Sequence, residues 1–137
     1  MLIQVDVVSA TESLYSGEAE CVFAPASTGE LGIYPKHMAL LSVLKPGEVR
    51  VQTAQGTESI YVSGGIVEVQ PDTVTIFSDT AIRANDLDES KALEAKQRAE
   101  EAMTDSNNGH DIVSTQAALA EAMAQLQMIS KMRGKKL

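Results

Sequence analysis

Few side chains in this sequence have the type and spacing that catalytic chemistry needs. Cys21 is the only cysteine, which excludes an internal disulfide and a site made of several thiolates, and we expect it to be a small buried residue on a strand. His37 and His110 stand far apart, neither lies in an HExxH spacing, and no metal site is predicted. Neither histidine is near a GxSxG turn that would supply a nucleophile. The sequence therefore favours an interaction protein, without catalytic residues of its own, over an enzyme.

Two other stretches have compositions that occur in phosphate-binding or regulatory sites. Gly64-Gly65 could begin a phosphate loop, but the sequence contains no GxxxxGK and strand-like residues follow, so we predict a bulge or a tight turn. The stretch Ser78–Ala92 (SDTAIRANDLDESKA) contains a cluster of carboxylates, in which Asp88 stands three residues before Lys91. Asp88 is a good candidate for a helix N-cap. Whether the cluster only starts a helix or also regulates the protein is open at this point.

The charge of the chain is unevenly distributed. The net charge of −8 at pH 7 disfavours nucleic acid as a partner, because its phosphates would be repelled. Residues 1–86 hold 11 acidic and 4 basic side chains, whereas residues 87–137 hold 8 and 7. Four of these bases crowd into the last seven residues: Lys131, Arg133, Lys135 and Lys136. An acidic body therefore carries a basic tip.

The composition fits a packed protein that does not insert into a membrane. The apolar fraction is 44% and the mean hydropathy is −0.06, so a packed core is expected. The longest apolar runs fall well below the ~18 residues that a membrane span needs. No basic leader precedes an apolar segment, so we expect a location on the cytosolic side.

Residues 1–84 predict short strands separated by turns that contain Gly or Pro. Ile3, Val5 and Val7 alternate with polar residues, as in a strand with one buried face. We expect a turn at Ser16-Gly17 and a second strand over Ala19–Ala24 that ends at Pro25. Further strands are expected around Val49–Gln52 and over Leu40–Leu44, Ser59–Ser63, Ile66–Val69 and Val74–Phe77. This pattern is typical of an antiparallel β-sandwich or flattened barrel.

The segment Gly29–Pro46 has the composition of a surface loop but carries large apolar side chains. Gly and Pro residues predict a loop, yet Leu31, Ile33 and Tyr34 lie within it. Apolar residues on such a loop either plug the end of a barrel or face a partner. The residues alone leave both interpretations open.

After Ser78–Ala92 the apolar period changes from that of strands to that of helices. Ala92–Met103 is dense in helix formers, and the sequence TDSNNG over residues 104–109 ends that helix. A second helix is expected from near Asp111, with a heptad-like seam of Ile112, Leu119, Ala122, Leu126 and Ile129. We therefore predict an α+β chain in which a sandwich domain (residues 1–84) precedes an antiparallel two-helix hairpin (residues 85–137). Because the seam is rich in alanine, both a hairpin with a second docked state and a permanent lid are open.

Several long stretches together resemble the epsilon subunit family of bacterial F-type ATP synthases. VDVVSA, GELGIYPKH, KPG, IYVSGGIVEVQP and TAIRANDLDE stand in the family's order, and the resemblance runs nearly from end to end. It implies a non-catalytic rotor subunit of the central stalk, which helps couple proton flow to ATP synthesis. It also implies a peripheral location at the cytoplasmic face of the bacterial inner membrane.

The resemblance also implies partners for the sandwich domain, namely the gamma subunit and the ring of c subunits. The segment Gly29–His37 matches the family's ring-contacting loop, which implies that the apolar loop faces a partner. The expected ring contacts are Glu30, Leu31, Gly32, Ile33 and Tyr34. Ser9, His37 and Ser42 match positions that face gamma in the family.

In the family, the helical hairpin folds beside the sandwich or extends along gamma into the catalytic alpha/beta hexamer, where it blocks ATP hydrolysis. The resemblance makes the basic tip, Lys131, Arg133, Lys135 and Lys136, a candidate contact for an acidic loop of the catalytic subunits. Exposed ion pairs contribute less than ~1 kcal/mol each, so this tip would bias the hairpin without anchoring it.

Some family members bind ATP through an Ile/Leu-Asp-x-x-Arg-Ala motif at the start of the first helix. The matching residues run from Leu87 to Ala92, with Lys91 in place of the arginine. Lysine lacks the planar fork that holds phosphate oxygens at two points, and Gln127 leaves the second helix without a base at its middle. We expect no cofactor and only weak ATP binding at Asp88 and Lys91. A nucleotide-sensing module whose hairpin closes on ATP is the alternative function.

Overall fold

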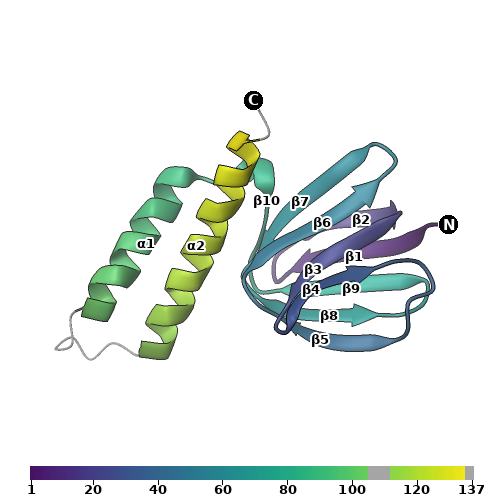
Figure 1. Ribbon diagram of the computed structural model, residues 1–137, viewed down its shortest axis with the longest axis horizontal. Helices are drawn as coiled ribbons and strands as arrows, with labels where there is room; N and C mark the ends of the chain where they lie inside the picture. The colour runs from purple at the N-terminus through teal and green to yellow at the C-terminus, as the bar shows by residue number, and fades with distance from the viewer. Residues whose placement is uncertain (105–111, 135–137) are drawn as a thin grey trace. The chain divides into compact units, whose positions relative to one another are not determined.

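The computed structural model describes residues 1–104 and 112–134, without the side chains of residues 112, 133 and 134. Within these residues, strands occupy the first part of the chain and two α-helices the last part (Figure 1). The chain divides into two compact units, Met1–Asn85 and Asp86–Leu137.

The first unit is a nearly closed β-sandwich. Its strands are β1 (Ile3–Ser9), β2 (Ser13–Ala19), β3 (Cys21–Ala26), β4 (Gly29–Ile33), β5 (Leu40–Leu44), β6 (Gly47–Thr53), β7 (Gly56–Val62), β8 (Gly65–Val69), β9 (Thr73–Ser78) and β10 (Ala81–Arg83). They are paired in the order β10-β7-β6-β3-β5-β8-β9-β1-β2, and β4 pairs with β3. The pairings are antiparallel except for β1 with β9, which is parallel and which the sequence did not indicate. The predicted fold class is confirmed.

The core is built from β-branched and aliphatic side chains that alternate along the strands. Ile3, Val5 and Val7 of β1 are fully buried, as their period of two predicts. At the two ends of the strand order, the Arg83 guanidinium of β10 donates a hydrogen bond to the Leu14 carbonyl of β2 at 3.0 Å. A side chain thus joins two terminal strands that no backbone ladder connects among the described residues.

Three sequence predictions about local structure in this unit were wrong. Ser16-Gly17 is not a turn but part of β2, because pairing with β1 holds the backbone extended. Pro25 does not end its strand. Proline cannot donate a hydrogen bond to a neighbouring strand. On one side of β3 the neighbour changes here, from β6 at Cys21–Phe23 to β5 at Ala26, so no ladder hydrogen bond is lost on this side at Pro25.

The third error concerns Gly29–Ile33, which was predicted to be a loop. It forms strand β4 in a tight hairpin with β3, in which Ser27 and Thr28 are the connecting residues. The φ angle of Gly29 is 137°, which a residue with a side chain rarely adopts. At Gly64 and Gly65, where a bulge or a tight turn was predicted, the backbone bends with positive φ at both residues, and β8 begins directly at Gly65.

A short 3-10 helix, η1 (Ala84–Asp86), contains the boundary between the units, and the second unit holds α1 (Glu89–Thr104) and α2 (Ile112–Gly134). The two α-helices lie side by side and run in opposite directions, as predicted (Figure 1). The buried positions of α1 are Ala92 and Ala99. Of the predicted seam on α2, Ala122 and Ile129 are buried and Leu119 and Leu126 are half-buried, while the side chain of residue 112 is outside the described part. No helix in the described ranges is long and apolar enough to span a bilayer.

Candidate functional site

A row of apolar side chains crosses the outer face of four neighbouring strands, β5, β8, β9 and β1. Val43, Ile66, Phe77 and Val8 stand opposite one another in the strand register. Val43 is 61% exposed, Ile66 48% and Phe77 53%, while Val8 is half-buried. We call these four residues the outer apolar row. A contiguous exposed apolar row on a sheet is typical of a surface that binds a partner.

The apolar surface continues beyond this row toward the start of β5. Leu41 points to the same side as Val43, because side chains two residues apart share a face of a strand. A shallow groove of about 360 Å³ lies here, lined by Ala39, Leu40, Leu41, Glu68, Val69 and Gln70. The candidate surface therefore spans more than one row of the sheet.

Sequence reasoning missed the outer apolar row. The available signal was that β5 (LLSVL), β8 (GIVEV) and β9 (TVTIFS) carry apolar residues at both odd and even positions. A strand that covers a core on one side only should alternate apolar with polar residues. Apolar residues on both faces thus indicate a second buried surface in an assembly.

The three predicted gamma contacts lie near this face but do not form one cluster. Ser9 ends β1 and Ser42 lies on β5, so the two occupy the outermost strands of the four that carry the row. His37 lies in the connection between β4 and β5, with its Nδ1 atom 2.8 Å from the carbonyl oxygen of Met38. Ser42 is half-buried, and its partner in the register is the buried Val67.

The Ser9 side chain stabilises a turn of its own chain through hydrogen bonds. It is only 6% exposed, and its Oγ accepts hydrogen bonds from the backbone N–H groups of Thr11 at 3.3 Å and Glu12 at 3.2 Å. The same hydroxyl donates to the Glu12 carbonyl at 3.2 Å. Ser9 therefore holds the β1–β2 turn, and Thr11 and Glu12, which are exposed, present that turn to the surroundings.

The five predicted ring contacts divide between the two faces of β4 and its end. Ile33 is fully buried, and Leu31 packs against the core. Glu30 and Tyr34 are exposed, and Gly32 lies between them on the same side. The outward set is therefore Glu30, Gly32 and Tyr34.

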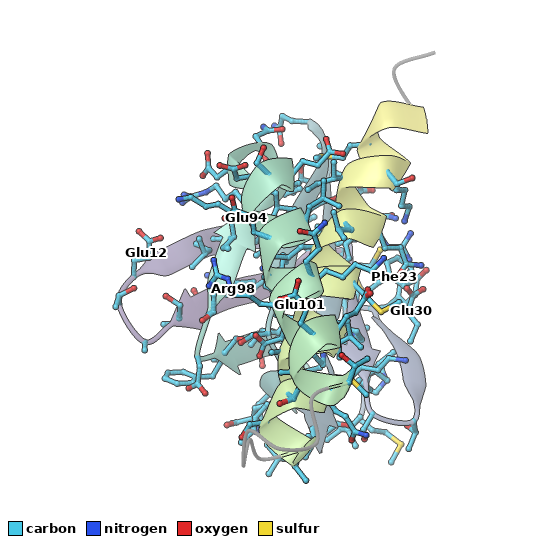
Figure 2. The ribbon with its side chains drawn as sticks, turned by 90° about the vertical axis from the view of Figure 1, so that its left-hand side faces the viewer. Glu12, Phe23, Glu30, Glu94, Arg98 and Glu101 are labelled. Carbon is cyan, nitrogen blue, oxygen red and sulfur yellow. The ribbon has the colours of Figure 1, made fainter. Side chains whose placement is uncertain are left out.

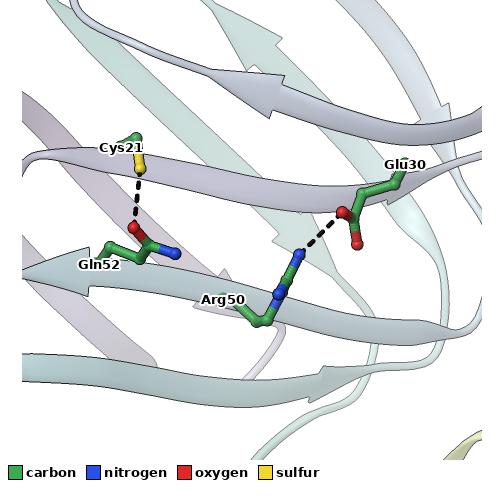
Figure 3. A network of polar contacts seen from close by, with 4 residues as sticks. All are labelled: Cys21, Glu30, Arg50 and Gln52. Atoms are coloured by element: carbon green, nitrogen blue, oxygen red, sulfur yellow. Dashed lines mark hydrogen bonds and ion pairs between the residues drawn. The ribbon is translucent and has the colours of Figure 1, made fainter.

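A polar and aromatic cluster surrounds this outward set. Arg50 of β6 donates a hydrogen bond from Nη2 to Glu30 Oε1 at 2.7 Å, drawn in Figure 3. The Arg50 guanidinium carbon lies 4.7 Å from the centre of the Phe23 ring. Phe23 meets Tyr34 edge to face, with ring centres 6.2 Å apart and an angle of 87° between the rings. Glu30 and Tyr34 are thus linked through Arg50 and Phe23.

Cys21 lies on the same strand as Phe23 but is buried, as predicted. Its Sγ donates a weak hydrogen bond to Gln52 Oε1 at 3.3 Å (Figure 3). Burial raises the pKa of the Cys21 thiol, which keeps it in the protonated, unreactive form at neutral pH. The described residues contain no group of three or more His, Cys, Asp or Glu side chains that could hold a metal ion.

At the start of the helical unit, Asp88 is a helix cap. Its Oδ1 accepts a hydrogen bond from the backbone N–H of Lys91 at 3.3 Å, the geometry of an N-cap with the third residue of the helix. The predicted capping role is confirmed. The hydrogen bond between the two residues uses the Lys91 backbone, and the Lys91 side chain is exposed.

The rest of the hairpin surface carries mixed charge. Figure 2 shows Glu94 and Arg98 together on one side of α1, where Glu94 Oε2 and Arg98 Nη2 lie 3.7 Å apart. Lys96 and Glu100 form a second pair with the same spacing. Of the basic tip, Lys131 is exposed on α2, whereas Lys135, Lys136 and the side chain of Arg133 lie outside the described residues. The tip contact stays a prediction.

Both units of the chain match models of known protein families. Residues 2–84 match the model described as "ATP synthase, Delta/Epsilon chain, beta-sandwich domain", and residues 85–130 match "ATP synthase, Delta/Epsilon chain, long alpha-helix domain". The chain belongs to the delta/epsilon chain family of ATP synthase. The order of the two family domains is the order of the sandwich and the hairpin described above.

Members of this family from bacteria are similar over nearly their full length. The ATP synthase epsilon chain of Vesicomyosocius okutanii subsp. Calyptogena okutanii is 80% identical over 134 residues, 98% of this chain and 97% of that protein. The ATP synthase epsilon chain of Alkalilimnicola ehrlichii is 55% identical over 132 residues, 96% of this chain and 94% of that protein.

Two solved structures share the fold of this family member at low identity. One is a chain in the mitochondrial ATP synthase of Euglena gracilis, with a TM-score of 0.69, 19% identity, and coverage of 99% of this chain and 82% of that one. The other is a chain in the central stalk and c-ring of the Tetrahymena thermophila mitochondrial ATP synthase, with a TM-score of 0.63, 14% identity, and coverage of 93% and 96%. These likenesses extend to both the strands and the helices.

Proposed function

We propose that this family member is a non-catalytic rotor subunit of the ATP synthase central stalk, located at the cytoplasmic face of the cell membrane. Its sandwich joins gamma to the ring of c subunits and so helps couple proton flow to ATP synthesis. Its hairpin restrains ATP hydrolysis by reaching the catalytic alpha/beta hexamer. The observation that carries this proposal is the outer apolar row on a sandwich of this family.

The outer apolar row is the surface assigned to gamma. Val43, Ile66 and Phe77 are each about half exposed or more, so covering them removes a large apolar area from water. The predicted gamma positions Ser9 and Ser42 lie on the two outermost of the four strands, but they stand opposite the buried Ser78 and Val67, so their side chains point to the core side and not into the outer apolar row. Ser9 contributes by shaping the turn that carries Thr11 and Glu12, and His37 by ordering the backbone next to the exposed Met38.

The ring of c subunits is assigned to the outward side of β4. Glu30 offers a carboxylate, Tyr34 an exposed ring, and Gly32 a place where a partner can approach the backbone closely. Leu31 and Ile33 support this strand from the core side. Glu30, Gly32 and Tyr34 therefore face the ring, whereas Leu31 and Ile33 hold the strand in place.

The hairpin is assigned the regulatory role. Its buried positions on α1 are both alanine, and small side chains remove little apolar area from water, so the hairpin can change partners at modest cost. Lys131 and the three bases that follow it are the proposed contacts with the acidic catalytic subunits. Each such pair is weak, which suits a contact that must be reversible.

Co-purification tests the proposed binding of the sandwich to the gamma subunit. The full chain, carrying an affinity tag, is expressed together with the gamma subunit of the same ATP synthase. Stoichiometric recovery of gamma is expected, and the chain shortened to residues 1–86 should recover it equally well. Failure of the full chain to retain gamma would refute the assignment of the sandwich.

A further inference from the structure

We propose that Arg50 is a positioning residue on the outward side of β4, which fixes Glu30 directly through a hydrogen bond and Tyr34 through the Phe23 ring. This inference rests on the proposed function, because that function assigns the outward side of β4 to the ring of c subunits. Arg50 lies two strands away from β4, so its side chain must reach across β3 to contact Glu30.

The strand register explains how the four side chains meet. Phe23 of β3 stands opposite Arg50 of β6 on one side and opposite Gly32 of β4 on the other. Side chains that stand opposite one another share a face of the sheet. Arg50, Phe23 and Gly32 therefore form one row, and Glu30 and Tyr34 flank Gly32 on the same face.

Gly32 leaves the space that the Phe23 ring uses. A Cβ atom at Gly32 would lie only 3.1 Å from Cε1 of Phe23. The ring thus leans over β4 between Glu30 and Tyr34, meeting the Tyr34 ring edge to face. A glycine at this position is what allows a side chain of β3 to order Glu30 on β4 and Tyr34 directly after β4.

Arg50 completes the arrangement from the other side of β3. Its guanidinium stacks over the Phe23 ring at 4.7 Å and donates to Glu30 Oε1 at 2.7 Å, reaching across β3 (Figure 3). The Glu30 carboxylate is thereby held in one orientation, and its second oxygen can accept a hydrogen bond from a partner. A planar guanidinium can stack flat on a ring and donate in its own plane at once, whereas a lysine ammonium is a compact charge with no planar face to stack.

The ion pair between Arg50 and Glu30 adds little to the stability of the fold. The Arg50 side chain is 25% exposed and that of Glu30 57%, and pairs this accessible contribute little to folding stability. Their value lies in preorganisation, because ordering a contact residue before binding removes an entropic cost from association. Arg50 is therefore expected to affect partner binding more than folding.

The test is a double-mutant cycle on association with detergent-solubilised c-ring that carries bound gamma subunit. Arg50→Gln should weaken association about fivefold in the wild-type background and less than about twofold in a Glu30→Gln background. Arg50→Lys should give an intermediate loss. Arg98→Gln, which removes an exposed arginine from the Glu94 pair on α1, is the matched control and should change nothing. Equal losses from Arg50→Gln in both backgrounds would overturn the proposal.

A second measurement on the isolated full chain separates this inference from the proposed function. The Arg50 side-chain protons should show an NMR shift from the Phe23 ring current, and Phe23→Leu should abolish it. Absence of the shift in the wild type would overturn the inference whatever the ring experiment gives. If the shift is present but Glu30→Gln and Tyr34→Ala bind the ring like the wild type, the ring assignment of the proposed function fails and the inference falls with it.

Discussion

Ile66 on β8 lies directly opposite Phe77 on β9, and both side chains point away from the core with about half of their surface exposed. Their neighbours along the strands, Val67 and Ile76, are fully buried on the other face. This part of the sheet is therefore apolar on both sides. A sandwich that worked alone would have polar residues at these outward positions.

Ile66→Asp should separate partner binding from folding. The outward position tolerates a polar side chain in the free chain, so the free energy of unfolding should fall by less than ~1 kcal/mol. A carboxylate buried against gamma without a partner should weaken association by at least about tenfold. Binding is measured by titration with gamma, and Thr57→Asp on β7, another exposed strand position, is the control. Unchanged binding of Ile66→Asp would remove gamma from this face.

Asp88→Ala should loosen the hairpin without touching the sandwich. It removes the hydrogen bond to the Lys91 N–H, and the loss of an N-cap costs about 1 kcal/mol. Asp88→Asn should retain most of the stability because an amide oxygen also caps. Hydrogen exchange of the α1 amides measures the change, with the β1 amides as the internal reference. If alanine and asparagine behave alike, capping is not what Asp88 does.

ATP should bind weakly or not at all to the isolated chain. Asp88 is already engaged as a cap, and Lys91 offers a single ammonium where two-point recognition of phosphate needs an arginine. Isothermal titration calorimetry with ATP at millimolar concentration should show no saturable heat. Lys91→Arg tests the reason, since it should raise the affinity if the missing fork is the cause. Saturable binding by the unaltered chain would favour the nucleotide-sensing alternative.

Folding stability should decline on the alkaline side. Burial raises the pKa of the Cys21 thiol, and burial together with the Glu58 carboxylate raises the pKa of the Tyr15 phenol. The folded state therefore holds these protons more tightly than the unfolded chain does. The stabilisation is complete below the unfolded pKa values, about 8.5 for a thiol and 10 for a phenol, and is lost as pH rises through the folded values.

Urea unfolding between pH 7 and about pH 10 measures this decline. The free energy of unfolding should fall from about pH 8.5 upward, and Cys21→Ala should make the first part of the fall shallower. The same Cys21→Ala variant should match the wild type in slope near pH 7, where the thiol is protonated in both states. An identical slope in the two proteins across the alkaline range would show that Cys21 does not contribute.

The sequence predicted those features that depend on neighbouring residues. The cap at Asp88 needs only the three residues that follow it. The change from strand to helix period near residue 85 is also local, because each side chain's spacing is set by its own element. Fold class and the order of sandwich and hairpin follow from these local signals.

The errors concern segments whose conformation is set from a distance. Gly29–Ile33 has the composition of a loop, but its backbone pairs with β3 along its whole length. Pro25 stays inside a strand because two different strands flank β3, which no local pattern records. Apolar residues on both faces of β5, β8 and β9 were visible in the sequence, but their alignment into the outer apolar row requires four strands that are distant in sequence to be placed side by side.

ATP hydrolysis by the reconstituted enzyme tests most directly whether the sandwich serves assembly and the hairpin restrains hydrolysis. ATP synthase is assembled with the full chain or with the chain shortened to residues 1–86, and the amount of assembled enzyme is measured in both. We predict equal assembly and faster hydrolysis with the shortened chain. An equal rate, or loss of assembly without the hairpin, would contradict this account.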